Sequence, residues 1–400
     1  MDEDIKPMLH TLVYVKQWGR YLAFAEKRSD TRDDSALNLV MRTGKPEEHG
    51  CLEWSPIKDL REARKDGYRS MNPCPVFSQS QETLFLFFIC IEGRIREGAL
   101  SPGQTRLCYV ATDNAGETWS EVKDLTETVG GINLLHYKTF AVGPGHGLEV
   151  DRSWSGLGSS TTNKRLLIPA YVITKRGNSH SLLFYSDDDG ESWQAGKQLV
   201  QECGENQVAE VRVNGGTESY LYCSSRSTWG RGLQQVPRTE ALSDDAGESF
   251  TKLQTLALKE TPHGCQGSVL AFPALKRRGA AVAGHRHGGP SSGSGSDTWL
   301  LYSHPARGPL NGEGQWIRRD LGVFLRESLQ DGGGRDHKPW GEPHILHHGM
   351  SGYSDLAEGS AEGHFACLME CGEAAKLRIV FKEFDISEIP KPAGGSMSGA

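Results

Sequence analysis

The chain has 400 residues, of which 37% are hydrophobic and 24% are charged, and its formal net charge is −7. A chain of this length can bury a large core, either as two or three domains or as one closed β architecture. The acidic balance, without a basic footprint, argues against a nucleic-acid-binding protein. No apolar run reaches roughly 18 residues and the first residues are acidic, so neither a transmembrane helix nor a signal peptide is expected.

The nine cysteines are scattered along the chain, and no CxxC pair occurs. An odd number without paired spacing predicts reduced, mostly buried thiols in a cytosolic setting. Cys367 and Cys371 are close in sequence, but their strand-like surroundings argue against a zinc site. No metal and no cofactor are therefore expected.

Short apolar runs rich in β-branched and aromatic residues recur along the whole chain, and turn residues usually separate them. No helical period extends beyond two turns. The pattern predicts an all-β protein with strands at 12–15, 21–25, 36–41, 84–91, 106–111, 165–173, 181–185, 219–223, 267–272, 298–303, 321–325, 364–369 and 377–384. Residues 68–75 and 140–147 are instead interpreted as constrained loops.

One turn motif occurs three times, at 112–119, 186–193 and 243–250. Its frame is Ser/Thr-x-Asp/Asn-x-Gly-x-Ser/Thr-aromatic, in which the hydroxyl and carboxylate can bond local N–H groups and glycine accepts a positive φ. Each copy directly follows a predicted strand, which is 239–242 for the third copy, so the motif closes a hairpin at the same place in successive units. About six four-stranded units fit the chain, which predicts a six-bladed β-propeller.

The predicted propeller is a single domain that spans residues 1–390. Residues 276–296 combine a Lys-Arg-Arg run with Gly/His-rich and Gly/Ser-rich runs, which predicts a flexible loop insertion. The basic part of this loop offers a contact for anionic lipid headgroups, although a solvated loop is the simpler interpretation. Residues 391–400 are rich in Gly, Ser and Pro and are predicted to be a disordered tail.

Several charged or polar residues lie next to predicted strand ends, and each alone is more simply explained as part of an ion-paired surface turn. In a propeller, however, the strand ends that carry a site gather on one face. This would bring together six residues: Arg28, Asp33, Glu205, Arg226, Arg318 and Tyr353. Arginines, carboxylates and a tyrosine in one cleft suit an anionic sugar.

The order of many short motifs carries a family resemblance. They are AFAEKR (23–28), RSMNPCP (69–75), TFAVGPGHG (139–147), LLIPAY (166–171), ENQVAE (205–210), PHGCQGSV (262–269), WLLYSHP (299–305), RRDLG (318–322) and GYSDL (352–356). From about residue 12 to about residue 384 the chain resembles the vertebrate sialidases (neuraminidases), and most of all the membrane-associated, ganglioside-preferring member. The resemblance implies a six-bladed propeller whose repeated acidic turns lie away from the active site.

The same resemblance implies the activity and its partners. The expected function is an exo-α-sialidase that releases terminal sialic acid, with retention, from gangliosides, glycoproteins and oligosaccharides. The chain is expected either to associate peripherally with the plasma membrane or an endomembrane or to lie in the cytoplasm. No nucleic-acid partner is expected. The sequence carries no lipid-anchor motif, because position 2 is Asp2 and the C-terminus does not end in a CaaX box.

The resemblance also implies roles for individual residues. Tyr353 matches the nucleophile, Glu205 its base and Asp33 the general acid/base, with Glu210 as the alternative to Glu205. Arg226 and Arg318 match two of three arginines that hold the sialic-acid carboxylate. Arg28 matches a further arginine of the substrate pocket. Three more positions match residues near the glycerol and N-acyl groups of the substrate: Asn72, Tyr171 and Gln266.

A tyrosine nucleophile suits this substrate. Sialic acid carries a carboxylate on its anomeric carbon, and this negative charge would repel a carboxylate nucleophile. A phenol with an ordinary pKa near 10 is neutral, but it needs a neighbouring base to act as a nucleophile. Sialidases are the known tyrosine exception among glycosidases.

The sequence departs from the family at the first of the three arginines, which belongs to an Arg-Ile-Pro motif. Ungapped alignment places Met8 at the arginine position, and Lys6-Pro7 is at best a remnant of the motif. The expectation is a chain without the usual N-terminal segment and with weakened activity. The alternatives are an inactive sialoside-binding propeller and an interaction scaffold without sialic-acid binding.

Overall fold

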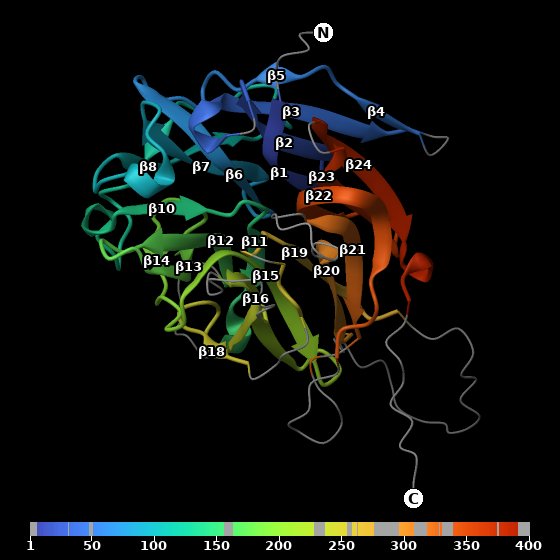
Figure 1. Cartoon of the computed structure of the whole chain (residues 1–400). Coiled ribbons are helices and arrows are strands. Elements are labelled where there is room, and N and C mark those ends of the chain that lie inside the picture. Colours follow the sequence, from blue (N-terminus) through green and yellow to red (C-terminus); the bar gives the residue numbers. More distant parts are fainter. Residues whose placement is uncertain are drawn as a thin grey trace, which may run out of the picture.

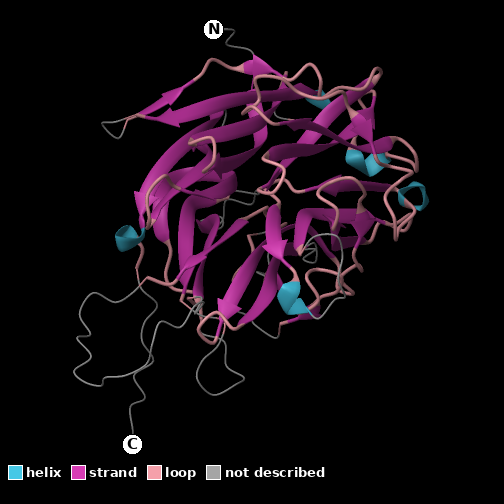
Figure 2. Cartoon of the chain, turned by 180° about the vertical axis from the view of Figure 1, so that it is seen from behind, coloured by secondary structure: helices cyan, strands magenta, loops and turns pink. Residues whose placement is uncertain are grey.

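The computed structural model describes residues 6–30, 32–47, 51–155, 163–227, 237–253, 258–261, 263–275, 296–307, 318–327, 329, 339–373 and 376–390. Within these ranges the regular secondary structure is almost entirely β-strand, shown in magenta in Figure 2. The helical elements are short 3₁₀ turns at Asp33–Ser35, Glu97–Ala99, Leu134–His136, Ser153–Ser155 and Ile386–Glu388. The all-β prediction is confirmed. Nearly all of the predicted loop 276–296 and the whole predicted tail 391–400 lie outside the described residues.

The described strands form five antiparallel sheets. The first contains β1 (Lys6–Val15), β2 (Arg20–Arg28), β3 (Ala36–Pro46), β4 (Leu52–Trp54) and β5 (Lys58–Asp59). The second contains β6 (Tyr68–Ser78), β7 (Thr83–Glu92), β8 (Thr105–Thr112) and β9 (Lys123–Asp124). The third contains β10 (Thr139–Val142), β11 (Leu148–Asp151), β12 (Lys164–Ile173), β13 (Ser179–Ser186) and β14 (Gln194–Ala195).

The last two sheets complete the ring. The fourth contains β15 (Cys203–Val213), β16 (Glu218–Ser227), β17 (Thr239–Ser243) and β18 (Thr251–Lys252). The fifth contains β19 (Ser268–Pro273), β20 (Thr298–Arg307), β21 (Arg319–Arg326), β22 (His344–Glu358), β23 (His364–Glu373) and β24 (Lys376–Asp385). In Figure 1 the sheets follow one another around a common axis, and the first sheet (blue) lies beside the last (red).

This arrangement is a β-propeller, but the predicted count of six blades is not confirmed. The fifth sheet has six strands because β22 is long and has two partners. Its first part pairs with β21 and its second part with β23, and the two parts meet at Met350. The strands that would form a separate sixth sheet are therefore hydrogen-bonded into the fifth.

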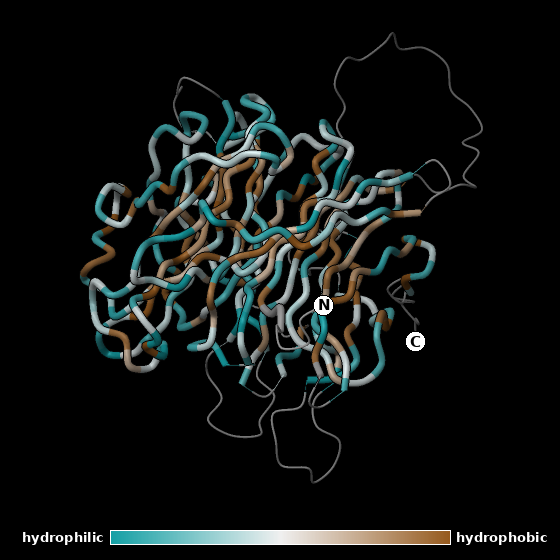
Figure 3. The backbone as a smooth tube through the Cα atoms, turned by 90° about the horizontal axis from the view of Figure 1, so that it is seen from above, coloured by the Kyte–Doolittle hydropathy of each residue, from teal (hydrophilic) through white to brown (hydrophobic). Residues whose placement is uncertain are grey.

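Packing between neighbouring sheets supplies the core. Strand β7 is buried along most of its length, from Leu84 to Ile91, because both faces of its sheet are covered. Leu, Phe and Ile can therefore follow one another in this strand, where a half-exposed sheet would alternate polar and apolar residues. Viewed from above in Figure 3, apolar segments run along the strands and polar segments lie mainly at the periphery.

The three repeated turns have the predicted geometry. In the second copy, Ser186 Oγ accepts a hydrogen bond from Gly190 N at 2.8 Å, and Asp188 Oδ1 accepts one from Ser192 N at 2.9 Å. The other two copies repeat this pair of bonds. The closing Trp193 donates to Gly190 O and packs edge-on against Phe87 of the neighbouring sheet, with 4.5 Å between ring centroids. The motif therefore joins adjacent sheets.

The segment 68–75 and the first part of the segment 140–147, both interpreted as loops, are strands, whereas residues 143–147 form a loop as predicted. Residues 68–75 belong to β6 and residues 139–142 form β10, the first strand of its sheet. Strand β6 has a register shift between Met71 and Cys74, and Asn72 at the shift has a φ of 56°. Such a bulge re-aims side chains, and here it directs Asn72 to the cavity described below.

All nine cysteines are free thiols, and only Cys51 is exposed. Burial of the other eight agrees with the prediction of mostly buried thiols. None of the described helices is long and apolar enough to cross a bilayer.

Candidate active site

A hollow of ≈ 1110 Å³ lies where strand ends and loops from all five sheets meet. Residues that are far apart in the sequence line it together. All predicted site residues except one are among them: Arg28, Asp33, Asn72, Tyr171, Glu205, Arg226, Arg318 and Tyr353. The exception, Gln266, is discussed below.

At one wall of this cavity, a tyrosine, a glutamate and an arginine are in direct contact. The hydroxyl of Tyr353 on β22 donates a hydrogen bond to Oε1 of Glu205 on β15. Arg226 on β16 places Nη1 2.8 Å from Glu205 Oε2 and 3.0 Å from the Tyr353 hydroxyl oxygen. Burial raises the pKa of Tyr353 well above its ordinary value and the Glu205 charge raises it further, whereas Arg226 and Arg318 oppose this rise. The phenol is therefore protonated at rest, with an acceptor for its proton in contact.

Two arginines are held by one short backbone segment. Arg226 Nη2 donates to the carbonyl of His263 at 2.9 Å, and Arg318 Nη2 donates to the carbonyl of Gly264 at 2.8 Å. The Arg318 guanidinium also lies 5.4 Å from the centroid of the Tyr353 ring. Gly264 has a φ of +70°, and a Cβ there would lie 2.8 Å from Arg226 Cγ. Glycine is needed at this position for both reasons.

Arg28 on the first sheet forms ion pairs with two carboxylates, Asp33 and Glu26. Arg28 Nη1 is 2.8 Å from Asp33 Oδ1, and the Asp33 side chain is 66% exposed. On its other side Arg28 contacts Glu26, with Nε 2.8 Å from Oε2. The second oxygen of Glu26 accepts a hydrogen bond from Asn72 N at 2.7 Å. The arrangement leaves the carboxylate of Asp33 accessible from the cavity while Arg28 stays fixed.

Glu26 was not predicted as a site residue. It is fully buried, and burial raises its pKa to about 7 despite the opposing charge of Arg28. Glu26 and Arg28 are two residues apart on β2, and residues at this spacing share one face of a strand. This spacing is the signal that could have identified Glu26.

Three further residues at the cavity were also missed. Glu97 accepts a hydrogen bond from the hydroxyl of Tyr171 at 3.1 Å. Arg69 donates to the carbonyls of Gly93 and Ile95 and so holds the loop that carries Glu97. Glu370 accepts hydrogen bonds from the backbone N–H groups of Leu9 and Tyr353.

Two residues named in the sequence analysis lie outside the cavity lining. Gln266 is buried and does not line the cavity, because its side-chain amide bonds to Pro144 O and to the backbone of Ser354. It fixes the strand next to Tyr353, and its contact with a substrate stays a prediction. The alternative base, Glu210, is paired with Arg212 and lies outside the cavity lining, so Glu205 is the carboxylate that Tyr353 contacts.

The predicted position of the first arginine lies close to the site. In the β1–β2 ladder Met8 pairs with Glu26, and the following residue, Leu9, lines the cavity. A register shift between Met8 and His10 and a φ of 45° at Leu9 mark a bulge at this point. The backbone of β1 therefore reaches the wall formed by Glu370 and Tyr353.

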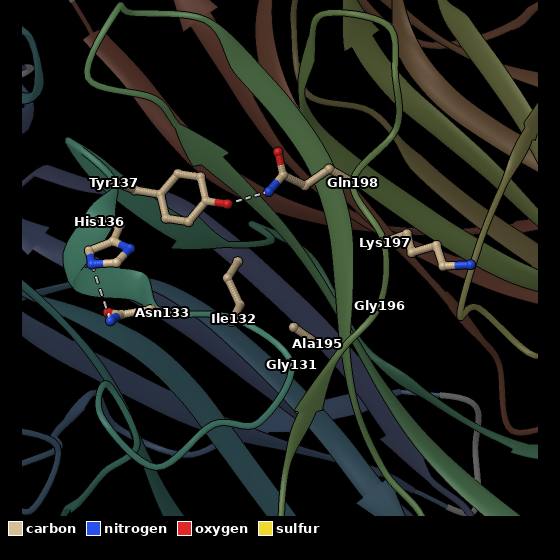
Figure 4. Close-up of a pocket in the computed structure, with 9 residues that line it drawn as sticks. All are labelled: Gly131, Ile132, Asn133, His136, Tyr137, Ala195, Gly196, Lys197 and Gln198. Atoms are coloured by element: carbon tan, nitrogen blue, oxygen red, sulfur yellow. Dashed lines mark hydrogen bonds between the residues drawn. The ribbon is translucent and has the colours of Figure 1, made fainter.

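A second, smaller hollow of ≈ 410 Å³ lies between the 131–137 loop and residues 195–198 (Figure 4). The side chains of Tyr137 and Gln198 are hydrogen-bonded across it. None of the predicted catalytic residues lines this hollow.

A propeller with a buried tyrosine–glutamate–arginine contact and further arginines in one cavity defines a protein of the sialidase class. Residues 19–366 match the family described as the BNR repeat-like domain. The chain is 38% identical to Sialidase-3 of Homo sapiens, covering 97% of this chain and 91% of that protein. It is 35% identical to Sialidase-2 of Mus musculus, with 94% and 91% covered. The chain therefore belongs to the vertebrate sialidase family, and it is an exo-sialidase, a glycoside hydrolase.

Solved structures are similar in fold. A Hadza microbial sialidase, Hz136, superposes with a TM-score of 0.70 at 20% identity, over 96% of this chain and 66% of that one. The Trypanosoma rangeli sialidase in complex with the inhibitor DANA superposes with a TM-score of 0.66 at 17% identity, and this chain covers 55% of it. At these identities the likeness concerns the fold alone.

Proposed function

We propose that the chain is a retaining exo-α-sialidase in which Tyr353 is the nucleophile, Glu205 its base and Asp33 the general acid/base. The observation that carries this assignment is the contact of the Tyr353 hydroxyl with both Glu205 and Arg226. A phenol this deeply buried holds its proton, so it needs an acceptor in hydrogen-bond contact to become a nucleophile. Glu205 is that acceptor.

In the first step Glu205 takes the phenolic proton while the Tyr353 oxygen attacks the anomeric carbon. The bond to the leaving oxygen breaks, and Asp33 gives that oxygen its proton. In the second step the Asp33 carboxylate takes a proton from water, and the water oxygen attacks the anomeric carbon. Tyr353 leaves and regains its proton from Glu205. Two inversions give net retention.

Arg226 and Arg318 are the proposed partners of the substrate carboxylate. Both guanidiniums border Tyr353, and the backbone of the 263–264 segment fixes one edge of each. A guanidinium matches a carboxylate with a fork of two N–H groups, which a lysine ammonium cannot copy. Arg28, Asn72 and Tyr171 line the same cavity and are proposed to contact other parts of the sugar.

The substrates are proposed to be gangliosides, glycoproteins and oligosaccharides with terminal sialic acid. The sequence resemblance to the ganglioside-preferring sialidase supports this choice. We also propose peripheral attachment to the plasma membrane or an endomembrane, which agrees with a ganglioside substrate. Flotation with liposomes tests the attachment, with and without anionic lipid. Absence of the protein from both floated fractions would contradict it.

The architecture fits six blades if the fifth sheet is counted as two. We infer that β22 is the outer strand of one blade through its first part and the inner strand of the next through its second part. Its change of partner near Met350 supports this division. The first half would then hold four strands, as in the usual blade, and the second half three.

The test of the mechanism compares the wild type with Tyr353→Phe on a fluorogenic sialoside. Removing the nucleophilic oxygen should lower kcat by about a thousandfold or more. Tyr220→Phe is the matched control, because Tyr220 lies outside the cavity lining and its hydroxyl donates to Glu218. Incubation with 2,3-difluorosialic acid followed by peptide mass spectrometry should place the adduct on Tyr353. Equal background signals from wild type and Tyr353→Phe at high enzyme concentration would overturn the proposal.

A weakened or inactive sialoside-binding propeller is the second candidate, and Met8 is the observation that favours it. If the site binds but does not turn over, calorimetry with a sialoside gives saturable binding while the fluorogenic assay stays at background. Turnover at the level of a three-arginine sialidase would exclude this candidate.

A further inference from the structure

Asp355 lies two residues after Tyr353 on β22, is fully buried, and accepts four hydrogen bonds. Its Oδ2 accepts from Thr11 Oγ1 at 2.6 Å and from Leu12 N at 2.8 Å. Its Oδ1 is 2.8 Å from His146 Nδ1 and accepts from Ser268 Oγ at 2.8 Å. A buried carboxylate is costly unless its oxygens are satisfied, and here both oxygens are.

The four donors come from separate parts of the propeller. Thr11 and Leu12 belong to β1 in the first sheet, and Ser268 belongs to β19 at the start of the fifth. His146 lies on the loop that follows β10 in the third sheet. One side chain therefore ties three sheets together near the axis, directly beside the proposed nucleophile.

His146 is the positive partner in this cluster. Burial favours neutral imidazole, but the Asp355 charge outweighs it and raises the pKa of His146. Burial likewise acts against the Asp355 carboxylate, yet His146 and the hydrogen bonds hold its pKa below the ordinary value. The negative charge of Asp355 also favours the protonated form of three other titratable groups, which are His10, Cys74 and Cys367. Burial lowers the pKa of His10 and raises those of the two thiols, so these three groups stay uncharged near neutral pH.

The backbone at Tyr353 depends on such side-chain anchors. The β22–β23 ladder shifts register between Ser351 and Ser354, so the regular pairing is interrupted at the nucleophile. Tyr353 N donates to Glu370 Oε2 at 3.2 Å, and Ser354 N donates to Gln266 Oε1 at 3.1 Å. At Gly352 a Cβ would lie 2.3 Å from Glu370 Oε2. Asp355 is the next anchor along the strand.

We propose that the Asp355–His146 pair is a positioning element for Tyr353, which keeps the phenol in register with Glu205 and Arg226. The pair touches no substrate and acts through the backbone of β22. This inference rests on the proposed role of Tyr353. A displacement of a reacting group by about 1 Å can cost a hundredfold in rate, so the effect should fall on kcat rather than on KM.

The experiment measures kcat, KM and their pH dependence for His146→Gln, His146→Ala and the control His136→Gln. His136 is an exposed histidine on the second hollow. We expect His146→Ala to lower kcat by about tenfold to a hundredfold with KM nearly unchanged. His146→Gln keeps a neutral donor, so it should recover part of kcat. The wild type should lose kcat as pH rises through the raised pKa of His146, and His146→Gln should lack this decline.

Two controls make the result decisive. Thermal melting and the rate of labelling by 2,3-difluorosialic acid are measured for each variant. Slower labelling of a fully folded His146→Ala protein supports positioning. A kcat and pH profile equal to wild type, or a loss of kcat no larger than the loss of folded protein, would overturn it. If Tyr353→Phe retains wild-type activity, the proposed function itself fails. If Tyr353→Phe is inactive and His146→Ala is as active as wild type, only the positioning role of His146 fails.

Discussion

Glu26 and Arg28 form a fully buried ion pair on β2, with Glu26 Oε2 2.8 Å from Arg28 Nε and 2.6 Å from Nη2. The pair lies directly behind Asp33, because the remaining Arg28 nitrogen contacts that carboxylate at 2.8 Å. Glu26 therefore determines where Arg28 points, and Arg28 in turn holds Asp33. A charged group that contacts no substrate is in this way coupled to the proposed general acid.

Glu26 should make stability fall as pH rises from about 4.5 to about 7. Burial raises its pKa from 4.5 to about 7, so in this window the folded protein binds a proton that the unfolded chain releases. Stability from this group is full below the unfolded pKa and is lost as pH approaches the folded one. Glu26→Gln should remove a pH-dependent loss of about 1–3 kcal/mol in the free energy of unfolding.

Urea unfolding of wild type and Glu26→Gln at pH 5 and pH 7.5 measures this effect. The difference between the two proteins isolates Glu26 from the other titrating groups. If the free energies of unfolding of wild type and Glu26→Gln differ by the same amount at both pH values, the prediction is contradicted.

Gly264→Ala should damage the arginine site without unfolding the protein. The new Cβ would meet Arg226 Cγ at 2.8 Å, so the guanidinium has to move away from Glu205 and Tyr353. We expect kcat/KM to fall by about tenfold or more, since a hydrogen bond to a charged group contributes roughly 1.5–3 kcal/mol. Gly215→Ala is the matched control, because Gly215 also has a positive φ, +71°, but has open space around its Cβ position. Both variants carry the backbone strain, so an equal loss of activity in both would refute the role of the Arg226 contact.

Trp193→Ala should affect stability and leave the chemistry unchanged. Trp193 is 2% exposed and packs against Phe87 of the neighbouring sheet, and it is not among the residues that line the cavity. Large-to-alanine substitutions of this kind cost about 3–5 kcal/mol. Phe250 occupies the same position in the third turn but is only partly buried, so Phe250→Ala should cost less. Denaturant unfolding gives both values, and a changed KM in the folded fraction of Trp193→Ala would argue against a purely structural turn.

The fold was predictable from the sequence where local chemistry is strong. The repeated turns carry their own hydrogen-bonding partners, such as Ser186 and Asp188, so their geometry does not depend on the rest of the chain. Apolar strands such as β7 are also recognisable from composition. The number of blades could not be counted from the turns, because no such motif marks the point where β22 passes from one partner to the next.

The strands that carry the site were the hardest to predict. β6 and β15 hold Asn72 and Glu205, and their polar or bulged positions interrupt the apolar pattern that identifies a strand. The convergence of Glu205 and Tyr353, 148 residues apart, was predicted from the propeller arrangement, whereas their separate roles followed from the family resemblance. The internal hydrogen bonds of Gln266 could not be predicted, because an amide that bonds internally and one that faces a substrate look the same in a sequence.

Met8→Arg should increase the activity of this chain. Met8 is the predicted counterpart of the first family arginine, and the backbone of β1 at Met8–Leu9 reaches Glu26 on one side and Glu370 on the other. An added guanidinium would supply another charged hydrogen bond to the substrate carboxylate, at roughly 1.5–3 kcal/mol, which corresponds to an increase of about tenfold to a few hundredfold in kcat/KM. Met8→Lys should give a smaller gain, because an ammonium lacks the forked geometry, and Met8→Leu should give none. Steady-state kinetics on one fluorogenic sialoside ranks the three variants, and a gain equal for arginine and leucine would show that charge at this position does not matter.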